Sequence, residues 1–164
     1  MDNDLIDELI YDWKNERPEL DSSAMEIVGR ILQLGKILEK RASDALLSTK
    51  IYYTDLDVLA TLRRSGKPYQ LTPTQLGKTV LITSGAMTAL LNRLEKLDLL
   101  TRIPDPKDAR VKSAALTKKG IKIIDKAIEL RFDEAKSAID FLTKTEKKQL
   151  SQLLKKMSLS LHSQ

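Results

Sequence analysis

Apolar residues recur every three or four positions along most of this sequence, which is the period of an α-helix that buries one face. After residue 98 the pattern changes, and two short β-strands joined by a polar turn are expected at residues 99–103 and 111–116. The predicted helices lie at about residues 5–13, 23–46, 54–64, 73–80, 83–97, 117–139 and 143–161. The expected fold class is therefore mostly α, with one small β-hairpin.

Polar residues with the chemistry of helix caps precede most of these segments. A Ser or Thr side chain at such a position accepts a hydrogen bond from a free backbone N–H of the first turn. The expected caps are Ser23, Thr72, Thr83, Thr117 and Thr143, with Glu26 and Glu146 completing capping boxes. Pro73, directly after Thr72, suits the first position of a helix.

Two short helices with a tight turn, followed by a hairpin, have the order of a winged helix-turn-helix. The second helix, at residues 83–97, turns small or neutral polar side chains outward, which allows close approach to a DNA major groove. Residues 51–117 are the expected DNA-binding region. Residues 1–50 and 118–164 are the expected dimerisation helices of one intertwined domain. The apolar surface of the helix at 23–46 exceeds what one small domain needs, so we expect a partner chain to cover it.

Charge is distributed unevenly along the chain. Residues 1–26 carry nine acidic residues against Lys14 and Arg17, so this segment has a net charge of −7, and the remainder carries +12. Residues 63–119 hold twelve Lys and Arg against four Asp and Glu. This cationic excess coincides with the predicted helix-turn-helix and wing, where contacts to DNA phosphates are expected.

Several functional classes lack their usual residues. The chain has no cysteine, and its one histidine is His162, which argues against thiol chemistry, a Ser-His-Asp site and a His- or Cys-based metal site. We expect no enzyme activity, no metal and no cofactor. No apolar run is long enough to span a bilayer, and the N-terminus does not resemble a signal peptide, so a cytoplasmic protein is expected.

The motifs resemble those of a known family. Residues 71–76 (LTPTQL), 84–88 (SGAMT), 93–95 (RLE), 105–110 (DPKDAR) and 116–120 (LTKKG) form an ordered series that closely resembles the multiple-antibiotic-resistance regulator (MarR) family. The resemblance covers roughly residues 25–160. It implies a homodimer with two winged heads on a pseudo-palindromic double-stranded DNA operator. Ala89 and Asp98 depart from the common pattern, and Asp98 stands where many members have a glycine in a left-handed turn.

The DNA-binding prediction combines the outward helix face, the cationic wing and this resemblance. The residues predicted to bind DNA are Thr72, Thr83, Ser84, Gly85, Thr88, Ala89, Asn92, Arg93, Lys107, Asp108, Arg110 and Lys112. The expected function is a transcriptional regulator, acting as a repressor, that a small aromatic or anionic ligand releases from DNA. The alternative is a winged-helix protein-interaction module, which would not need the cationic excess.

A sharper ligand hypothesis comes from a subgroup of the family that includes urate-responsive members. Its N-terminal extension is similar to residues 13–21. The resemblance implies that Trp13, Asp57, Arg64 and Arg102 bind an aromatic anion such as urate. Arg64 would hold the anion, Trp13 would stack on it, and Asp57 would pair with Arg102 in the empty site. The alternative is that Trp13 packs the N-terminal helix onto the dimer, and that Asp57 and Arg64 are surface charges.

Overall fold

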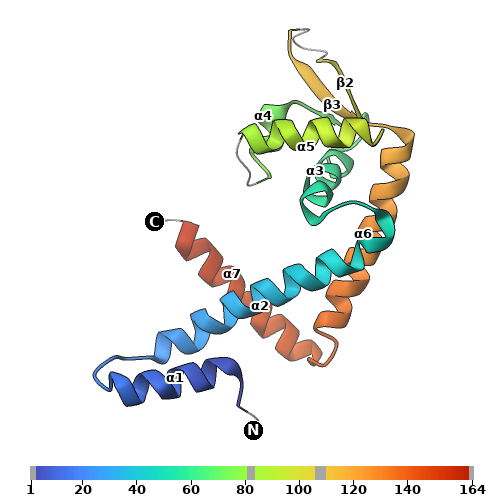
Figure 1. Cartoon of the computed structure of the whole chain (residues 1–164). Helices are drawn as coiled ribbons and strands as arrows, with labels where there is room; N and C mark the ends of the chain where they lie inside the picture. The colour runs from blue at the N-terminus through green and yellow to red at the C-terminus, as the bar shows by residue number, and fades with distance from the viewer. Residues whose placement is uncertain (1–2, 81–83, 106–109, 163–164) are drawn as a thin grey trace. The chain divides into compact units, whose positions relative to one another are not determined.

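The computed structural model describes residues 3–80, 84–105 and 110–162, except for the side chain of Ser84. It divides into two compact units, residues 1–41 and residues 42–164. The elements, in chain order, are α1 (Leu5–Glu16), α2 (Ser23–Ala45), the 3-10 helix η1 (Leu47–Thr49), α3 (Tyr53–Arg64), β1 (Gln70–Leu71), α4 (Pro73–Gly77), α5 (Ser84–Lys96), β2 (Leu100–Pro104), β3 (Lys112–Leu116), α6 (Lys118–Ala138) and α7 (Lys144–His162) (Figure 1). The mostly helical fold class predicted from the periodicity is confirmed.

In the first unit, α1 packs against the beginning of α2. Ile6 is buried, and its side chain lies so close to Gly29 that a Cβ there would be 3.1 Å from an Ile6 methyl group. Arg30 of α2 donates to Asp4 at 2.8 Å and to Asp7 at 2.6 Å, and Asp4 and Asp7 together cap α1. Because Arg30 donates to the Asp4 carboxylate, the pKa of Asp4 lies below its usual value. Apolar packing and this ion cluster hold the two helices together.

The second unit has one hydrophobic core, formed where α3, α4, α5, α6 and the sheet meet. Leu59 and Leu62 of α3, Leu76 of α4, Leu94 of α5 and Ile124 of α6 are fully buried there. These residues occupy the inward positions of their amphipathic helices, which is why short helices with little stability of their own fold as a group. The core therefore fixes α5 against its neighbours.

The sheet has three antiparallel strands in the order β1–β3–β2. The hairpin pairs Leu100 with Leu116 and Pro104 with Lys112, and Figure 1 shows it projecting beyond α5. Strand β1 pairs Leu71 with Ala114, and the sequence analysis did not predict it. A strand of two residues has no periodicity, so only its pairing with a distant segment defines it.

The turn between α5 and β2 depends on one left-handed residue and on one close backbone contact with α6. Asp98 has a φ of 58°, so the left-handed conformation expected from the sequence is confirmed. A Cβ on Gly120, at the start of α6, would overlap the carbonyl oxygen of Leu99. Thr117 caps α6 through Gly120 N at 2.9 Å and also donates from its hydroxyl to Asp98 O at 2.7 Å. The junction of α5, β2 and α6 is therefore tightly packed.

Two local predictions were wrong. Leu97 was expected to be the last residue of the helix at 83–97, but α5 ends at Lys96, and Leu97 is 39% exposed because the chain turns there. Ser23 was expected to cap α2, but it is already helical, and the backbone N–H of Ser23 donates to Asp21 at 2.9 Å. The predicted caps Thr72, Thr117 and Thr143 are confirmed. Thr83 lies outside the described residues.

Large apolar side chains remain exposed on the terminal helices of both units. On α2 they are Met25, Ile27, Val28, Leu32, Leu34, Ile37 and Leu38, and on α6 and α7 they include Phe132, Leu150, Leu153, Leu154, Leu159 and Leu161. Helix α7 buries none of its described residues. None of the described helices is both long and apolar enough to cross a bilayer. So much exposed apolar surface is typical of an unpartnered interface.

Candidate nucleic-acid interface

Helix α5 presents two chemically different faces. Met87, Leu91 and Leu94 are buried in the core of the second unit. The opposite face exposes the predicted DNA-binding residues Gly85, Thr88, Ala89 and Asn92. A Cβ on Gly85 would meet no other atom within 4 Å. This face therefore has short side chains over its first two turns, as a helix in a major groove requires.

Thr72, another predicted DNA-binding residue, has a structural task as well. Its hydroxyl accepts from Gln75 N at 3.2 Å, and its own backbone N–H donates to Gln75 Oε1 at 2.8 Å. This reciprocal pair is the capping box that begins α4. Helix α4 is thus fixed as the first helix of the pair. The side chain of Ser84 and all of Lys107 and Asp108 lie outside the described part of the chain.

Arg93, predicted to contact DNA, forms an ion pair inside the protein. Its Nη1 bonds to both carboxylate oxygens of Asp55 in α3, and the Asp55 side chain is completely buried. The guanidinium also lies 4.0 Å from the centroid of the Tyr52 ring. Asp55 in turn accepts from Tyr52 N at 2.7 Å. The contacts of Arg93 with Asp55 and Tyr52 were not predicted from the sequence, although Asp55 stands next to the inward-facing Leu56 of α3, where an acid needs a cation as a partner.

Arg102 links the wing to α5. Its Nη2 donates to Asn92 Oδ1, its Nε lies 3.5 Å from Glu95 Oε2, and its backbone N–H donates to Glu95 Oε1 at 3.2 Å. The predicted pairing of Arg102 with Asp57 is therefore not what the structure has. Strand β2 leaves α5 through the turn at Asp98, so its third residue lies beside the last turns of the same helix.

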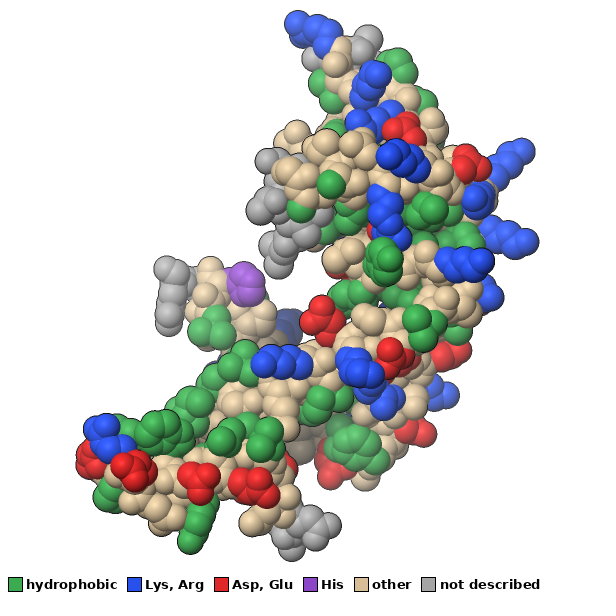
Figure 2. Space-filling view, in the orientation of Figure 1, with side chains coloured by type: hydrophobic (Ala, Val, Ile, Leu, Met, Phe, Trp, Pro, Cys, Tyr) green, Lys and Arg blue, Asp and Glu red, His purple; other side chains and the backbone are tan. Residues whose placement is uncertain are grey.

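The wing exposes two of the cations predicted to bind DNA. Arg110 and Lys112 are exposed at the tip and at the start of β3. The base of the tip is held by Asp105, whose N–H donates to Val111 O at 2.8 Å and whose Oδ2 accepts from Ser113 at 2.6 Å. Figure 2 shows Lys and Arg side chains over the region that Figure 1 labels α5, β2 and β3, and acidic side chains along α1. The charge separation predicted from sequence thus has a counterpart on the surface.

Asp57 and Arg64, from the predicted sensor set, lie on the exposed side of α3. Partial burial raises the pKa of Asp57, while the nearby cations Arg64 and Arg131 act in the opposite direction. Arg64 donates to Thr61 Oγ1 at 3.0 Å. It also lines a cavity of about 580 Å³ between α3 and α6. Arg131 was not anticipated from the sequence.

That cavity combines cationic and apolar groups. Its lining residues are Ala60, Arg63, Arg64, Asp125, Ile128, Glu129 and Phe132. Arg63 is committed to Asp125, at 2.7 Å and 3.3 Å, and to the hydroxyl of Tyr69 at 3.0 Å. Among the described residues, Arg64 has no carboxylate oxygen within 4.0 Å, although it interacts with Asp57 at longer range. Arg102 does not line this cavity.

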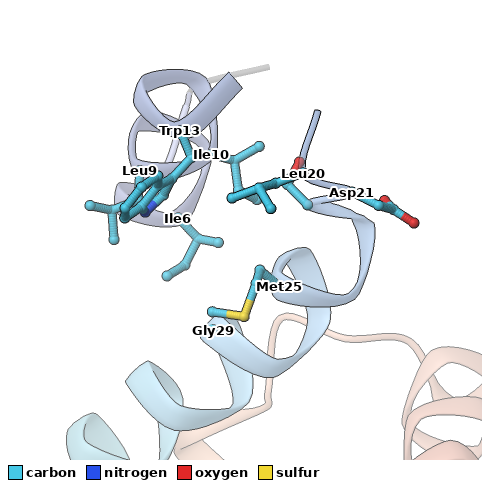
Figure 3. A pocket seen from close by; sticks show the side chains of 9 residues that line it. Ile6, Leu9, Ile10, Trp13, Leu20, Asp21, Met25 and Gly29 are labelled. Atoms are coloured by element: carbon cyan, nitrogen blue, oxygen red, sulfur yellow. The ribbon is translucent and has the colours of Figure 1, made fainter. Parts of the chain in front are cut away.

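Trp13 lies in the first unit and is 55% exposed. It lines an apolar pocket of about 330 Å³ between α1 and α2, with Ile6, Ile10, Leu20 and Met25 (Figure 3). Trp13 thus lies between α1 and α2 of the same chain, and its predicted roles in ligand binding or in packing onto a dimer stay predictions. In the part of the chain that the structure describes, no cluster of three or more His, Cys, Asp or Glu could hold a metal ion.

Comparisons with known proteins agree with this geometry. Residues 52–111 match the model of the MarR family. The chain is 29% identical to the HTH-type transcriptional regulator PecS of Dickeya dadantii, over 91% of this chain and 90% of PecS. It is 32% identical to the HTH-type transcriptional regulator MhqR of Bacillus subtilis, over 65% of this chain and 72% of MhqR.

A solved structure of a mutant MarR from E. coli, in complex with operator DNA, has the same fold. It superimposes with a TM-score of 0.70 and 25% identity, over 94% of this chain and 99% of that protein. The matched segment contains the helix pair, β2 and the start of the wing, and the relatives are transcriptional regulators. The chain is a winged helix-turn-helix protein and belongs to the MarR family of transcriptional regulators.

Proposed function

We propose that this chain binds double-stranded operator DNA through α5 and the wing. The observation that carries the proposal is the exposed face of α5, where Gly85, Thr88, Ala89 and Asn92 lie opposite a buried apolar face. These short side chains permit deep entry into the major groove, while Arg110 and Lys112 can reach adjacent phosphates. The operator-bound structure of E. coli MarR, which shares this fold, supports the proposal.

The active species that we propose is a homodimer. The exposed apolar side chains of α2, α6 and α7 supply the surface for it, in keeping with the division into dimerisation helices (1–50 and 118–164) and a DNA-binding region (51–117). A two-fold symmetric dimer requires a pseudo-palindromic operator with half-sites about one helical turn apart. The proposed regulator represses transcription in the cytoplasm, where it meets chromosomal DNA, and has no catalytic activity.

A small aromatic anion, such as urate, is the proposed ligand. The supporting observation is the cavity between α3 and α6, where the Arg64 guanidinium and the Phe132 ring provide an anion partner and an apolar contact. Asp57 lies close enough to Arg64 to interact with it electrostatically. A bound anion would compete for Arg64, and it would release DNA only as far as it prefers the state that does not bind DNA.

The test is fluorescence anisotropy with a duplex selected by the protein from a random library, measured over a salt series with and without urate. We expect saturable, steeply salt-dependent binding that urate weakens in the wild type and not in Arg64→Ala. The matched control is Lys155→Ala on α7, which should respond to urate as the wild type does. Tight binding that is unaffected by urate would support the proposed DNA-binding function and would rule out urate as the ligand.

The second candidate function is a protein-docking module. A docking module would bind the selected duplex no better than a random one. The observation that favours DNA over docking is the set of exposed cations on the wing beside an α5 face whose first two turns carry no acidic residue.

A further inference from the structure

We propose that Arg102 fixes the side-chain amide of Asn92 so that Asn92 selects guanine in the operator. This inference rests on the proposed function, because it concerns how α5 distinguishes one base from another. The proposal starts from a single contact, in which Nη2 of Arg102 donates to Oδ1 of Asn92. The residue pair joins the wing strand β2 to the exposed face of α5.

The chemistry of arginine determines which way the amide faces. A guanidinium has only N–H donors, so it can bond to the amide oxygen of Asn92 and not to the amide nitrogen. Arg102 is itself held in place, because Glu95 lies 3.5 Å from its Nε and accepts from its backbone N–H at 3.2 Å. The orientation of the Asn92 amide is therefore set by groups outside the DNA.

The free end of the amide is a pair of N–H donors. Asn92 is exposed, and among the residues that the structure describes its Nδ2 has no hydrogen-bond partner. Gly85, Thr88 and Ala89 precede it on the same face, so no long side chain holds α5 away from a base edge. Nδ2 can then reach the floor of the major groove.

An unrestrained asparagine selects adenine, because its oxygen accepts from adenine N6 while its nitrogen donates to N7. Here Arg102 takes one of the two lone pairs of the oxygen and holds that end of the amide toward β2, so the nitrogen is the end offered to the base and an edge made of acceptors is favoured. Guanine presents two such acceptors, N7 and O6, whereas thymine presents one beside a methyl group. Asn92 is thus a base-selecting residue, and Arg102 is a positioning residue that acts through it.

The test is selection of duplexes from a random library by the full-length protein, followed by anisotropy with single-base changes in the selected operator. Asn92→Ala identifies the position that Asn92 contacts, because preference should vanish there and nowhere else in each half-site. We expect wild type to prefer guanine at that position by roughly tenfold. Arg102→Met should shift the preference to adenine, because the amide oxygen becomes available, and Arg102→Lys should retain guanine.

Lys119→Met is the matched control. Lys119 donates to Leu97 O at 2.7 Å, beyond the end of α5, so it supports the same helix without touching Asn92. It should change affinity for all duplexes alike and leave the guanine preference intact, and circular dichroism confirms that each variant is folded. If wild type selects an operator but Arg102→Met keeps guanine, or if Asn92→Ala alters no base position, this inference is wrong and the proposed function stands. If wild type selects no operator, both fall.

Discussion

The guanidinium of Arg93 in α5 pairs with the carboxylate of Asp55 in α3, whose side chain is completely buried. The pair ties the proposed DNA-contacting helix to the core, and Tyr52 stacks on the same guanidinium. The partial exposure of Arg93, at 35%, leaves one edge of the group at the surface. Its primary task is therefore to fix the position of α5.

Replacing Arg93 should destabilise the protein strongly. In Arg93→Met the buried carboxylate of Asp55 loses its cation, and breaking a buried pair in this way costs about 3–5 kcal/mol. Urea unfolding followed by circular dichroism measures the change. Arg64→Met, which removes an arginine from the exposed side of α3, should change the free energy of unfolding by less than about 0.5 kcal/mol. Equal effects of the two substitutions would contradict the anchoring role.

The glycine at the start of α6 should tolerate no side chain. In Gly120→Ala the new Cβ would overlap the carbonyl oxygen of Leu99, so the helix or the strand must shift, at a cost of at least about 2 kcal/mol. Gly77→Ala is the control, because a Cβ there meets nothing within 4 Å. Thermal unfolding of the two variants should show a large loss for the first and little change for the second.

Asp98 should be replaceable by glycine with a gain in stability. Its φ of 58° is costly for a residue with a Cβ, by roughly 1 kcal/mol, and glycine avoids that cost. We expect Asp98→Gly to raise the free energy of unfolding by up to about 1 kcal/mol, and Asp98→Val to lower it. A loss of stability in Asp98→Gly would mean that the Asp98 side chain contributes more than its backbone strain costs.

Asp57 should make stability depend on pH in a defined direction. Because its folded pKa is raised, the folded state holds the proton more tightly than the unfolded state does. The stabilisation from Asp57 is thus fully present below the ordinary value of 3.8 and is lost as pH rises through the raised pKa. Asp57→Asn should therefore be more stable than wild type at pH 7, by less than about 1 kcal/mol, and show no advantage at pH 3.5. Asp12→Asn on α1 is the control, and an equal gain at both pH values would refute the assignment.

Local chemistry was the part of the fold that sequence could predict. Thr72 and Thr117 were identified as caps because the bonds they make lie within one helical turn. The left-handed turn at Asp98 was expected from the family resemblance, because many members have a glycine at this position. Strand β1 and the partner of Arg93 were not, because each is defined by contact with residues far along the chain.

The predictions for the candidate site succeeded where they rested on local pattern and failed where they needed distant contacts. The outward face of α5 followed from helical periodicity, and the structure exposes Gly85, Thr88, Ala89 and Asn92 together. The pairing of Arg102 was predicted wrongly, because residue types alone do not show whether a strand arginine faces α3 or α5. Burial of Asp55, rather than its charge, was the information that the sequence lacked.

The wing cations should contribute to affinity through phosphates rather than through base identity. Arg110→Ala and Lys112→Ala should each reduce the slope of log affinity against log salt by about 1.8, because each substitution removes one phosphate contact from both protomers and each contact contributes about 0.9. Lys156→Ala on α7 should leave the slope unchanged. The base preferences of the selected operator should be the same in all three variants.

The most direct test of the central claim is the anisotropy of a selected operator duplex, titrated with the wild-type chain at several salt concentrations. The account predicts saturable binding that falls steeply with salt, is much tighter than binding to a random duplex, and has a stoichiometry of two chains for each operator. Binding that is weak and equal for selected and random duplexes would contradict operator recognition by α5 and the wing.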